Sequence, residues 1–224
     1  MYVPAAFHVD DPEQLARFMA EHSFATVITQ HEGFPFASHL PLLHERNAST
    51  PGKDLGPHGK LIGHLAKANP QWQAAVDQPA GIPVLAIFHG PHTYISPTWY
   101  AEPNTVPTWN YVAVHATGRL RLIHDDQRLL QLLTTTVNRY ESSQQQPWRI
   151  EDQDQTFIEK LLGGIVGFEI AIDRLEGKWK LNQNQSEARR ERVRDVLGQS
   201  SRDEDRMVAE LMHRSDELPT TRAS

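Results

Sequence analysis

Cysteine is absent from this sequence of 224 residues. Its absence excludes disulfide bonds, thiolate catalysis, and zinc or iron–sulfur sites that use cysteine ligands. Long apolar runs are absent too, since runs such as residues 84–88 and 165–172 are far too short to cross a bilayer. No basic start followed by an apolar stretch marks a signal peptide. We therefore expect a cytoplasmic protein without membrane segments.

Positive charge is in deficit, because 22 lysines and arginines stand against 28 acidic residues and give a formal net charge of -6. Proteins that bind DNA by neutralising its phosphates usually show a basic excess or a basic stripe. The one dense basic cluster, residues 189–194, is interrupted by Glu191. We interpret it as a solvated helix face. Composition therefore argues against direct DNA binding.

Familiar catalytic signatures are also missing. The sequence holds no glycine-rich phosphate loop, nucleophile elbow or dinucleotide fingerprint. It has 12 histidines, but neither a histidine pair on a clear helix nor a cluster of two histidines and a carboxylate can be read from it. We therefore assign no metal ligand and no catalytic residue, and we interpret the single histidines as hydrogen-bonded structural residues.

Hydrophobic periodicity and turn residues predict an α+β protein with mainly β structure. Strands are expected at residues 24–29, 36–43, 60–65, 82–88, 93–95, 112–122 and 165–172. Helices are expected at 12–21, after Asn69, from Asp125, at 157–162 and from Ser186 onward, with a loop at 47–59, a turn at 89–92 and a frayed tail. Early strands closed by a late strand suggest a small antiparallel barrel with helical decoration.

Residues 63–72 form the first segment that could carry chemistry. Lys67 lies between a strand end and a helix that Asn69 caps. Free N–H groups and the helix dipole favour an anion at such a place. The same residues also fit a plain capped helix with an exposed lysine, and both interpretations stay open.

Aromatic residues gather in two further segments, residues 88–100 and 106–111. Large rings beside Ser, Thr and Asn suit a flat heteroaromatic ligand. The same composition suits a dimer interface, and the two interpretations are compatible. Pro97, Pro103 and Pro107 indicate a rigid, irregular wall here.

These segments resemble conserved blocks of the PaiB family. The blocks are Met-Tyr-x-Pro-x-x-Phe at residues 1–7, Gly-His-Leu-Ala-Lys-Ala-Asn-Pro-Gln-Trp at 63–72, Phe-x-Gly-Pro-x-x-Tyr-Ile-Ser-Pro-x-Trp-Tyr at 88–100 and Val-Pro-Thr-Trp-Asn-Tyr at 106–111. Lys-Leu-Asn-Gln-Asn at 180–184 is similar to the family's Lys-Leu-Ser-Gln-Asn, with Asn182 in place of the usual serine. The resemblance covers roughly residues 1–198.

The resemblance implies a six-stranded antiparallel split β-barrel of the FMN-binding type, with helical decoration and a C-terminal helical extension. It places an FMN-binding domain at residues 1–184 and a charged helical extension with a frayed tail at 185–224. It also implies a homodimer that holds FMN between its subunits, and a negative transcriptional regulator.

Carried onto this chain, the resemblance implies the following flavin site. Ser38, His39 and Leu40 lie on the strand that passes the flavin, and His64, Lys67 and Asn69 face its phosphate. The ring is bordered by Trp99, Trp109, Asn110 and Tyr111, and covered by Lys180, Gln183 and Asn184. Lys67 is the expected cation, because a phosphate dianion needs a positive charge or several N–H donors.

Three functions are compatible with this site. The first is an FMN-binding regulator or sensor without turnover. The second is an FMN-dependent oxidoreductase, similar to a flavin reductase or a pyridoxamine-phosphate oxidase, in which the flavin carries the chemistry. The third is a haem-binding split barrel, suggested by the many histidines.

Overall fold

The computed structural model describes residues 1–46 and 56–217. Its strands are β1 (His8–Val9), β2 (Phe24–His31), β3 (Phe34–Pro41), β4 (Leu43–Glu45), β5 (Lys60–Ala66), β6 (Ile82–Ile95), β7 (Thr108–Ile123) and β8 (Ile165–Lys180). Its α-helices are α1 (Pro12–Glu21), α2 (Asp126–Glu141), α3 (Gln155–Leu162), α4 (Glu187–Gly198) and α5 (Asp203–Glu217). Short 3-10 helices are η1 (Ala5–Phe7), η2 (Pro70–Ala75), η3 (Pro97–Tyr100) and η4 (Ile150–Asp152). Among these helices, none is long and apolar enough to cross a membrane.

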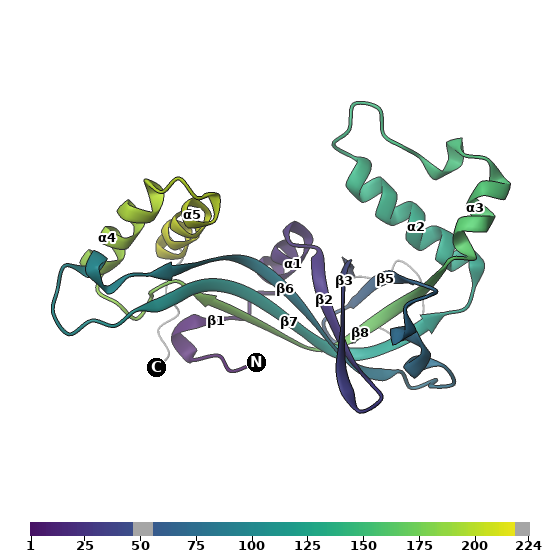
Figure 1. Ribbon diagram of the computed structural model, residues 1–224, viewed down its shortest axis with the longest axis horizontal. Helices are drawn as coiled ribbons and strands as arrows, with labels where there is room; N and C mark the ends of the chain where they lie inside the picture. Colours follow the sequence, from purple (N-terminus) through teal and green to yellow (C-terminus); the bar gives the residue numbers. More distant parts are fainter. Residues whose placement is uncertain (47–55, 218–224) are drawn as a thin grey trace. The chain divides into compact units, whose positions relative to one another are not determined.

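The strands form a single sheet in the order β3-β2-β6-β7-β8-β5-β4, and β1 pairs with β8 (Figure 1). The α+β class with an antiparallel sheet is as predicted, but the sheet has eight strands and the expectation of six was wrong. The two unexpected strands are β1 and β4, which span 2 and 3 residues. Strands this short give too little alternation for a sequence pattern to reveal them.

The chain forms two compact units, each built from separate segments. One unit, here called the barrel unit, contains residues 12–88 and 115–175. The other, here called the terminal unit, contains residues 1–11, 89–114 and 176–217 of the part that the structure describes. The long strands β6, β7 and β8 each contribute residues to both units. The predicted domain boundary at residue 184 stays a prediction.

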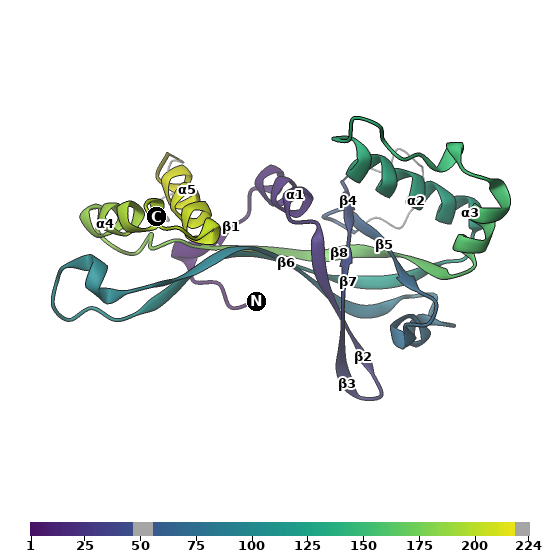
Figure 2. The same cartoon turned by 45° about the horizontal axis from the view of Figure 1, so that its top comes forward.

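In the barrel unit, β3 at one end of the strand order approaches β5 near the other end. A Cβ atom built on Gly63 of β5 would lie 2.7 Å from Leu42 Cδ2 and 3.3 Å from the backbone oxygen of Pro41, where β3 ends. Only glycine leaves room for this approach. The β2–β3 hairpin pairs along its whole length, whereas β2 pairs with β6 only at residues 26–28. The tip of the hairpin therefore extends past the neighbouring strand (Figure 2).

In the terminal unit, β1 pairs with the end of β8 through His8 and Lys178. Helices α4 and α5 pack against each other and bury an apolar set that has almost no exposed surface: Val193, Leu197, Val208 and Met212. Apolar burial of this kind supplies most of the stability of short charged helices. Residues 185–217 are therefore an integral part of this unit.

Two further sequence predictions need correction or extension. The expected turn at 89–92 is wrong, because β6 runs without a break from Ile82 to Ile95. The buried side chains of β6 have even residue numbers up to Phe88 and odd residue numbers from Pro91. In the sequence, this change in the alternation looks like a break between two strands. Strand β8 extends to Lys180, well past residue 172. The predicted loop at 47–59 falls mostly on residues 47–55, which lie outside the described residues, as does the predicted tail.

Candidate functional site

Two predicted flavin-site residues meet in the barrel unit: Ser38 of β3, expected on the strand that passes the flavin, and Asn69, expected to face the phosphate. Asn69 precedes η2 and caps it, since its Oδ1 accepts a hydrogen bond of 2.9 Å from the backbone N–H of Gln71. Its Nδ2 donates a hydrogen bond of 2.8 Å to Ser38 Oγ. Because Ser38 Oγ is an acceptor here, its own hydroxyl proton is free to donate to an anion. The second N–H of the Asn69 amide is a further donor.

Lys67 lies two residues before Asn69, in the turn that follows β5. Its backbone N–H donates to the Gly164 oxygen at 2.9 Å, and its backbone oxygen accepts from Trp72 Nε1 at 3.0 Å. The side chain is exposed. Within residues 1–46 and 56–217, its ammonium group has no hydrogen-bond or ion-pair partner. The turn is thus held by its backbone while the charge remains available to a ligand.

A pocket of about 830 Å³ opens beside Lys67 in the barrel unit. Trp72 and Val76 line it on one side, with apolar residues of β7, α2, α3 and β8 on the others. Its size falls within the range of small-molecule sites. Of the residues predicted to face the phosphate, His64 and Asn69 are not among its lining residues, and neither is Ser38, so the structure does not place the predicted phosphate residues around this one pocket.

The two predicted histidines of this region differ. His39 is exposed and its Nδ1 lies 3.0 Å from Thr26 Oγ1, its neighbour across the β2–β3 ladder. His64 of β5 is half-buried, and burial lowers its pKa. A histidine with a lowered pKa is neutral at pH 7, so His64 can offer a phosphate an N–H group but no charge. The third strand residue, Leu40, is buried in the core.

The predicted ring-binding residues lie in the terminal unit, where Trp109 is 52% exposed. Its ring meets Tyr94 edge-on with centroids 6.0 Å apart, and lies 6.2 Å from the ring of His92. Trp99 is half-buried in η3. Exposed rings of this kind offer flat apolar area to a ligand or to a partner chain.

The side chains of Asn110 and Tyr111 contact other residues of the same unit. Asn110 is fully buried, its Nδ2 contacts Met212 Sδ of α5 at 3.5 Å, and its Oδ1 has no hydrogen-bond partner among the described residues. The ring of Tyr111 lies 5.1 Å from Lys178 Nζ, a cation–π contact. Lys178 also donates to the Tyr2 backbone oxygen at 3.1 Å.

Lys180, at the end of β8, is tied to the aromatic segment. Its Nζ donates hydrogen bonds of 2.5 Å to Thr108 Oγ1 and to the Trp109 backbone oxygen. Burial, and then the nearby charge of Lys178, lower the pKa of Lys180. This lysine therefore fixes the start of β7 and carries a proton that is easier to remove than usual.

In the turn after β8, the side chain of Gln183 forms hydrogen bonds with nearby backbone groups. Gln183 accepts from the Leu181 N–H at 2.8 Å and donates to the Trp179 oxygen at 2.6 Å. Asn182 has a φ of 65° and donates to Tyr100 Oη at 3.1 Å, so the residue that replaces the family's serine is a structural contact. Asn184 is exposed. That Lys180, Gln183 and Asn184 cover a flavin stays a prediction.

The predicted site residues thus fall into two sets. Six of them (Ser38, His39, Leu40, His64, Lys67 and Asn69) belong to the barrel unit, and the others (Trp99, Trp109, Asn110, Tyr111, Lys180, Gln183 and Asn184) belong to the terminal unit. Sequence reasoning missed Gln71, which is buried beside Asn69. Its place directly after the cap residue and the helix-starting proline was the only available signal.

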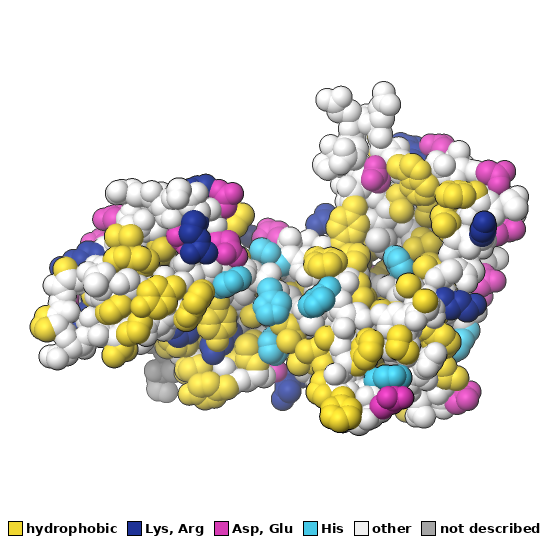
Figure 3. Space-filling model, in the orientation of Figure 1, with side chains coloured by type: hydrophobic (Ala, Val, Ile, Leu, Met, Phe, Trp, Pro, Cys, Tyr) yellow, Lys and Arg dark blue, Asp and Glu magenta, His cyan; other side chains and the backbone are white. Residues whose placement is uncertain are grey.

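The basic cluster of α4 is engaged within its own unit. Arg189 Nη2 and Arg192 Nη1 donate to the two oxygens of Glu102 at 2.6 and 3.0 Å. These hydrogen bonds lower the pKa of Glu102. Arg190 donates to Ser215 Oγ at 3.3 Å. On the face in view, acidic and basic side chains are mixed over α4 and α5 (Figure 3), as on ordinary solvated helices.

Comparison with known proteins identifies the family. Residues 1–174 match the family model described as "Putative FMN-binding domain". The chain is 37% identical over 215 residues to "Protease synthase and sporulation protein PAI 2" of Bacillus subtilis, covering 95% of this chain and 96% of that protein. The chain belongs to the PaiB family of FMN-binding proteins. The chain is also similar to an uncharacterised protein of Emericella nidulans. The two are 31% identical over 213 residues, which cover 81% of this chain and 82% of that protein.

Solved structures show the same fold at low sequence identity. The flavocytochrome Anf3 from Azotobacter vinelandii aligns with a TM-score of 0.53 and 15% identity, over 77% of this chain and 69% of its own. A conserved hypothetical protein from Mycobacterium tuberculosis aligns with a TM-score of 0.54 and 12% identity, over 82% of this chain and 92% of its own. The expected split-barrel class is therefore confirmed for this PaiB protein, and FMN is its cofactor.

Proposed function

We propose that this PaiB protein binds FMN through the phosphate, using the Lys67 ammonium, the Ser38 hydroxyl and the Asn69 amide. The hydrogen bond of 2.8 Å from Asn69 to Ser38 is the observation that carries the proposal. It orients two polar side chains from segments far apart in the sequence and leaves a free donor on each. The charge of Lys67, two residues before Asn69 and without a partner among the described residues, would complete a set of donors that suits a phosphate dianion. When bound, FMN supplies redox chemistry through its ring, and these residues supply the anchor.

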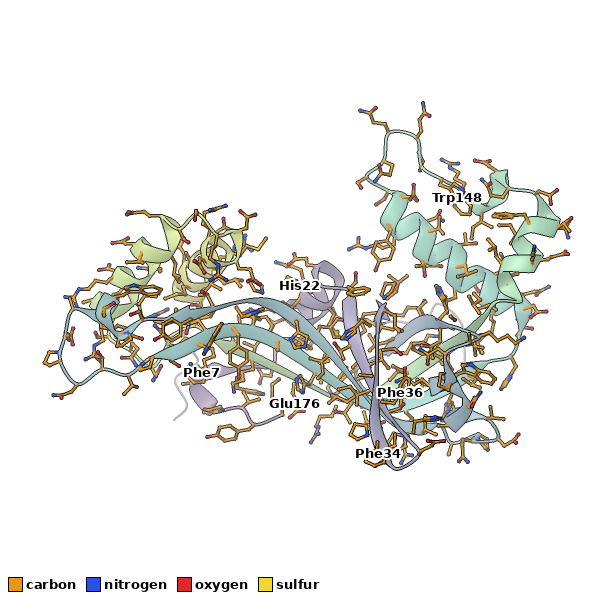
Figure 4. The ribbon with its side chains drawn as sticks, in the orientation of Figure 1. Phe7, His22, Phe34, Phe36, Trp148 and Glu176 are labelled. Atoms are coloured by element: carbon orange, nitrogen blue, oxygen red, sulfur yellow. The ribbon has the colours of Figure 1, made fainter. Side chains whose placement is uncertain are left out.

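The proposal also includes a homodimer. The β2–β3 hairpin carries exposed Phe24 and Phe34, which are 67% and 75% exposed, and Figure 4 shows Phe34 at the tip of the hairpin. Exposed aromatic side chains are typical of interfaces between subunits. A second copy of the chain that covers the hairpin would remove this apolar surface from water. Light scattering should give twice the mass of 25.4 kDa, and the Phe34→Ser variant should shift toward monomer.

These features fit a cytoplasmic, flavin-dependent regulator that does not bind DNA directly. The name of the Bacillus subtilis relative connects that protein to protease synthesis and sporulation. In this chain, Arg189 and Arg192 are paired with Glu102, which leaves them poorly placed for DNA phosphates. The alternatives, an FMN-dependent oxidoreductase and a haem-binding protein, stay predictions.

The decisive experiment compares two flavins. The purified protein is titrated with FMN and with riboflavin, which lacks the phosphate, and quenching of flavin fluorescence gives each affinity. We expect FMN to bind at least 100-fold more tightly than riboflavin, and the Lys67→Met and Asn69→Ala variants to remove most of that difference. Equal affinities for the two flavins would overturn the phosphate anchor. A mobility-shift series in salt tests the regulator, and steep weakening with salt would reveal direct phosphate contacts to DNA.

A further inference from the structure

Gln71, the second residue of η2, has an unusual environment. Its side chain is buried, with 1% of the residue exposed. The two N–H groups of Nε2 are shared among three acceptors of the β2–β3 hairpin, at 3.0 Å to the Val27 oxygen, 3.1 Å to Thr29 Oγ1 and 3.2 Å to the Phe36 oxygen. One amide group therefore bridges both strands of the hairpin (Figure 4 labels Phe36).

The same amide also has a feature that lowers the stability of the folded protein. Its Oε1 is buried and has no hydrogen-bond partner among the described residues. A buried acceptor that loses water without gaining a donor destabilises the folded state. Exchanging the oxygen and nitrogen of the amide would place its oxygen against the Val27 and Phe36 carbonyl oxygens, which only accept, so the exchange would lose two hydrogen bonds. A buried group with such a cost calls for a role beyond filling space.

We propose that Gln71 is a positioning residue for phosphate recognition, locking η2 onto the hairpin so that Asn69 meets Ser38. This inference rests on the proposed function, because it takes the Asn69–Ser38 pair as the phosphate anchor. Ser38 lies on β3, and it faces Val27 across the ladder. The Val27 oxygen is itself an acceptor of the Gln71 amide. Gln71 thus holds the strand position that carries Ser38.

The connection to Asn69 runs through the backbone of Gln71. The Gln71 N–H donates to Asn69 Oδ1 at 2.9 Å, which turns the Asn69 amide so that Nδ2 points at Ser38 Oγ. The backbone N–H of Gln71 therefore orients Asn69, and the side chain of Gln71 holds the hairpin that carries Ser38. Small displacements of positioned groups weaken recognition strongly, so loss of the Gln71 amide should act on phosphate binding and leave contacts with the flavin ring intact.

The test uses the Gln71→Met variant, which keeps the length of the side chain and removes its hydrogen bonds. We expect FMN affinity to fall at least tenfold and riboflavin affinity to change less than twofold. Gln73→Met is the matched control, because Gln73 lies on the same 3-10 helix and is exposed; its affinities should equal those of the parent protein. Thr29→Val, which removes a single acceptor, should give a smaller loss in the same direction and also covers the case in which Gln71→Met fails to fold.

A second measurement needs no flavin. Inorganic phosphate should protect the parent protein and Gln73→Met against thermal unfolding, and should protect Gln71→Met much less. Equal losses of FMN and riboflavin affinity in both Gln71→Met and Thr29→Val would show a purely structural role and overturn the inference, as would unchanged FMN affinity. The proposed function fails separately, if the parent protein binds FMN and riboflavin equally or if Asn69→Ala retains the preference for FMN.

Discussion

Thr93 of β6 donates a hydrogen bond of 2.5 Å to the Oδ1 atom of Asp205 in the first turn of α5. Ser200 donates to the other oxygen of the same carboxylate at 2.6 Å. Burial pushes the pKa of Asp205 up, but the hydrogen bonds from Ser200 and Thr93 and the charges of Arg202 and Arg206 outweigh it and leave the pKa below its ordinary value. This carboxylate fastens α5 to the sheet of its unit.

Replacing Asp205 by Ala should therefore lower the free energy of unfolding by about 3 kcal/mol, since hydrogen bonds to a charged group contribute about 1.5–3 kcal/mol each. Because the folded pKa is depressed, the stabilisation is present above the unfolded pKa and is lost as pH falls through the folded value. Urea unfolding at pH 7 and pH 3 measures both effects. Asp203→Ala, in the same turn but exposed, should change stability little; equal losses in the two variants would contradict the assignment.

The pKa of Lys180 should lie below the ordinary lysine value. Burial comes first among the causes of its lowered pKa, followed by the charge of Lys178. Reductive ¹³C-methylation and NMR across pH 7–11 would resolve a lysine signal that shifts at lower pH than the rest. That signal should disappear in Lys180→Met and move back toward the ordinary lysine value in Lys178→Met. A Lys180 signal that titrates with the surface lysines would refute the prediction.

Mild acid should destabilise the barrel unit. Burial is the first cause of a lowered pKa at His22, His44 and His64. The unfolded chain therefore binds more protons below about pH 6.5, and the free energy of unfolding falls as pH drops below that value, by at most about 1.4 kcal/mol per pH unit for each histidine. Urea unfolding between pH 7.5 and 5 measures this slope. His64→Gln should reduce it and the exposed His124→Gln should not.

Gly118 of β7 should tolerate no side chain. A Cβ atom at this position would lie 1.9 Å from the backbone oxygen of Ala171 on β8, and a backbone atom in a sheet has little room to move. Gly118→Ala should cost about 3 kcal/mol, at the upper end of overpacking effects. Gly163→Ala is the control, because its nearest neighbours are 3.5 and 3.7 Å away. Calorimetry should show a large loss of thermal stability for the first variant only.

The sequence predicted most elements because their patterns are local. Pro12 starts α1, Asp125 caps α2 through the Arg128 N–H, and alternation from residue 112 to 122 marks β7. These signals arise within a few residues of the element that they define. The strand β6 was predicted as two pieces because its buried face changes phase between Phe88 and Pro91, which only the pairing with neighbouring strands explains.

The site was less accessible to sequence reasoning. Lys67 and Asn69 were found because they stand together in one block. The Asn69–Ser38 contact joins residues 31 positions apart, and the acceptors of Gln71 lie on both strands of the hairpin. Such partners depend on strand register and on how a helix docks, which no local pattern contains. The Gln183 amide is hydrogen-bonded to neighbouring backbone groups, which no sequence pattern indicated, and its contact with the flavin stays a prediction.

The route of the chain through the two units limits how this protein can be divided. The chain passes from one unit to the other after Asp11, Phe88, Val114 and Leu175, and the last three of these points fall inside β6, β7 and β8. No single cut can release either unit as a continuous piece. A gene fragment ending at residue 184 would leave the terminal unit without α4 and α5, and would remove the partners of Tyr100 and Thr93 on those helices.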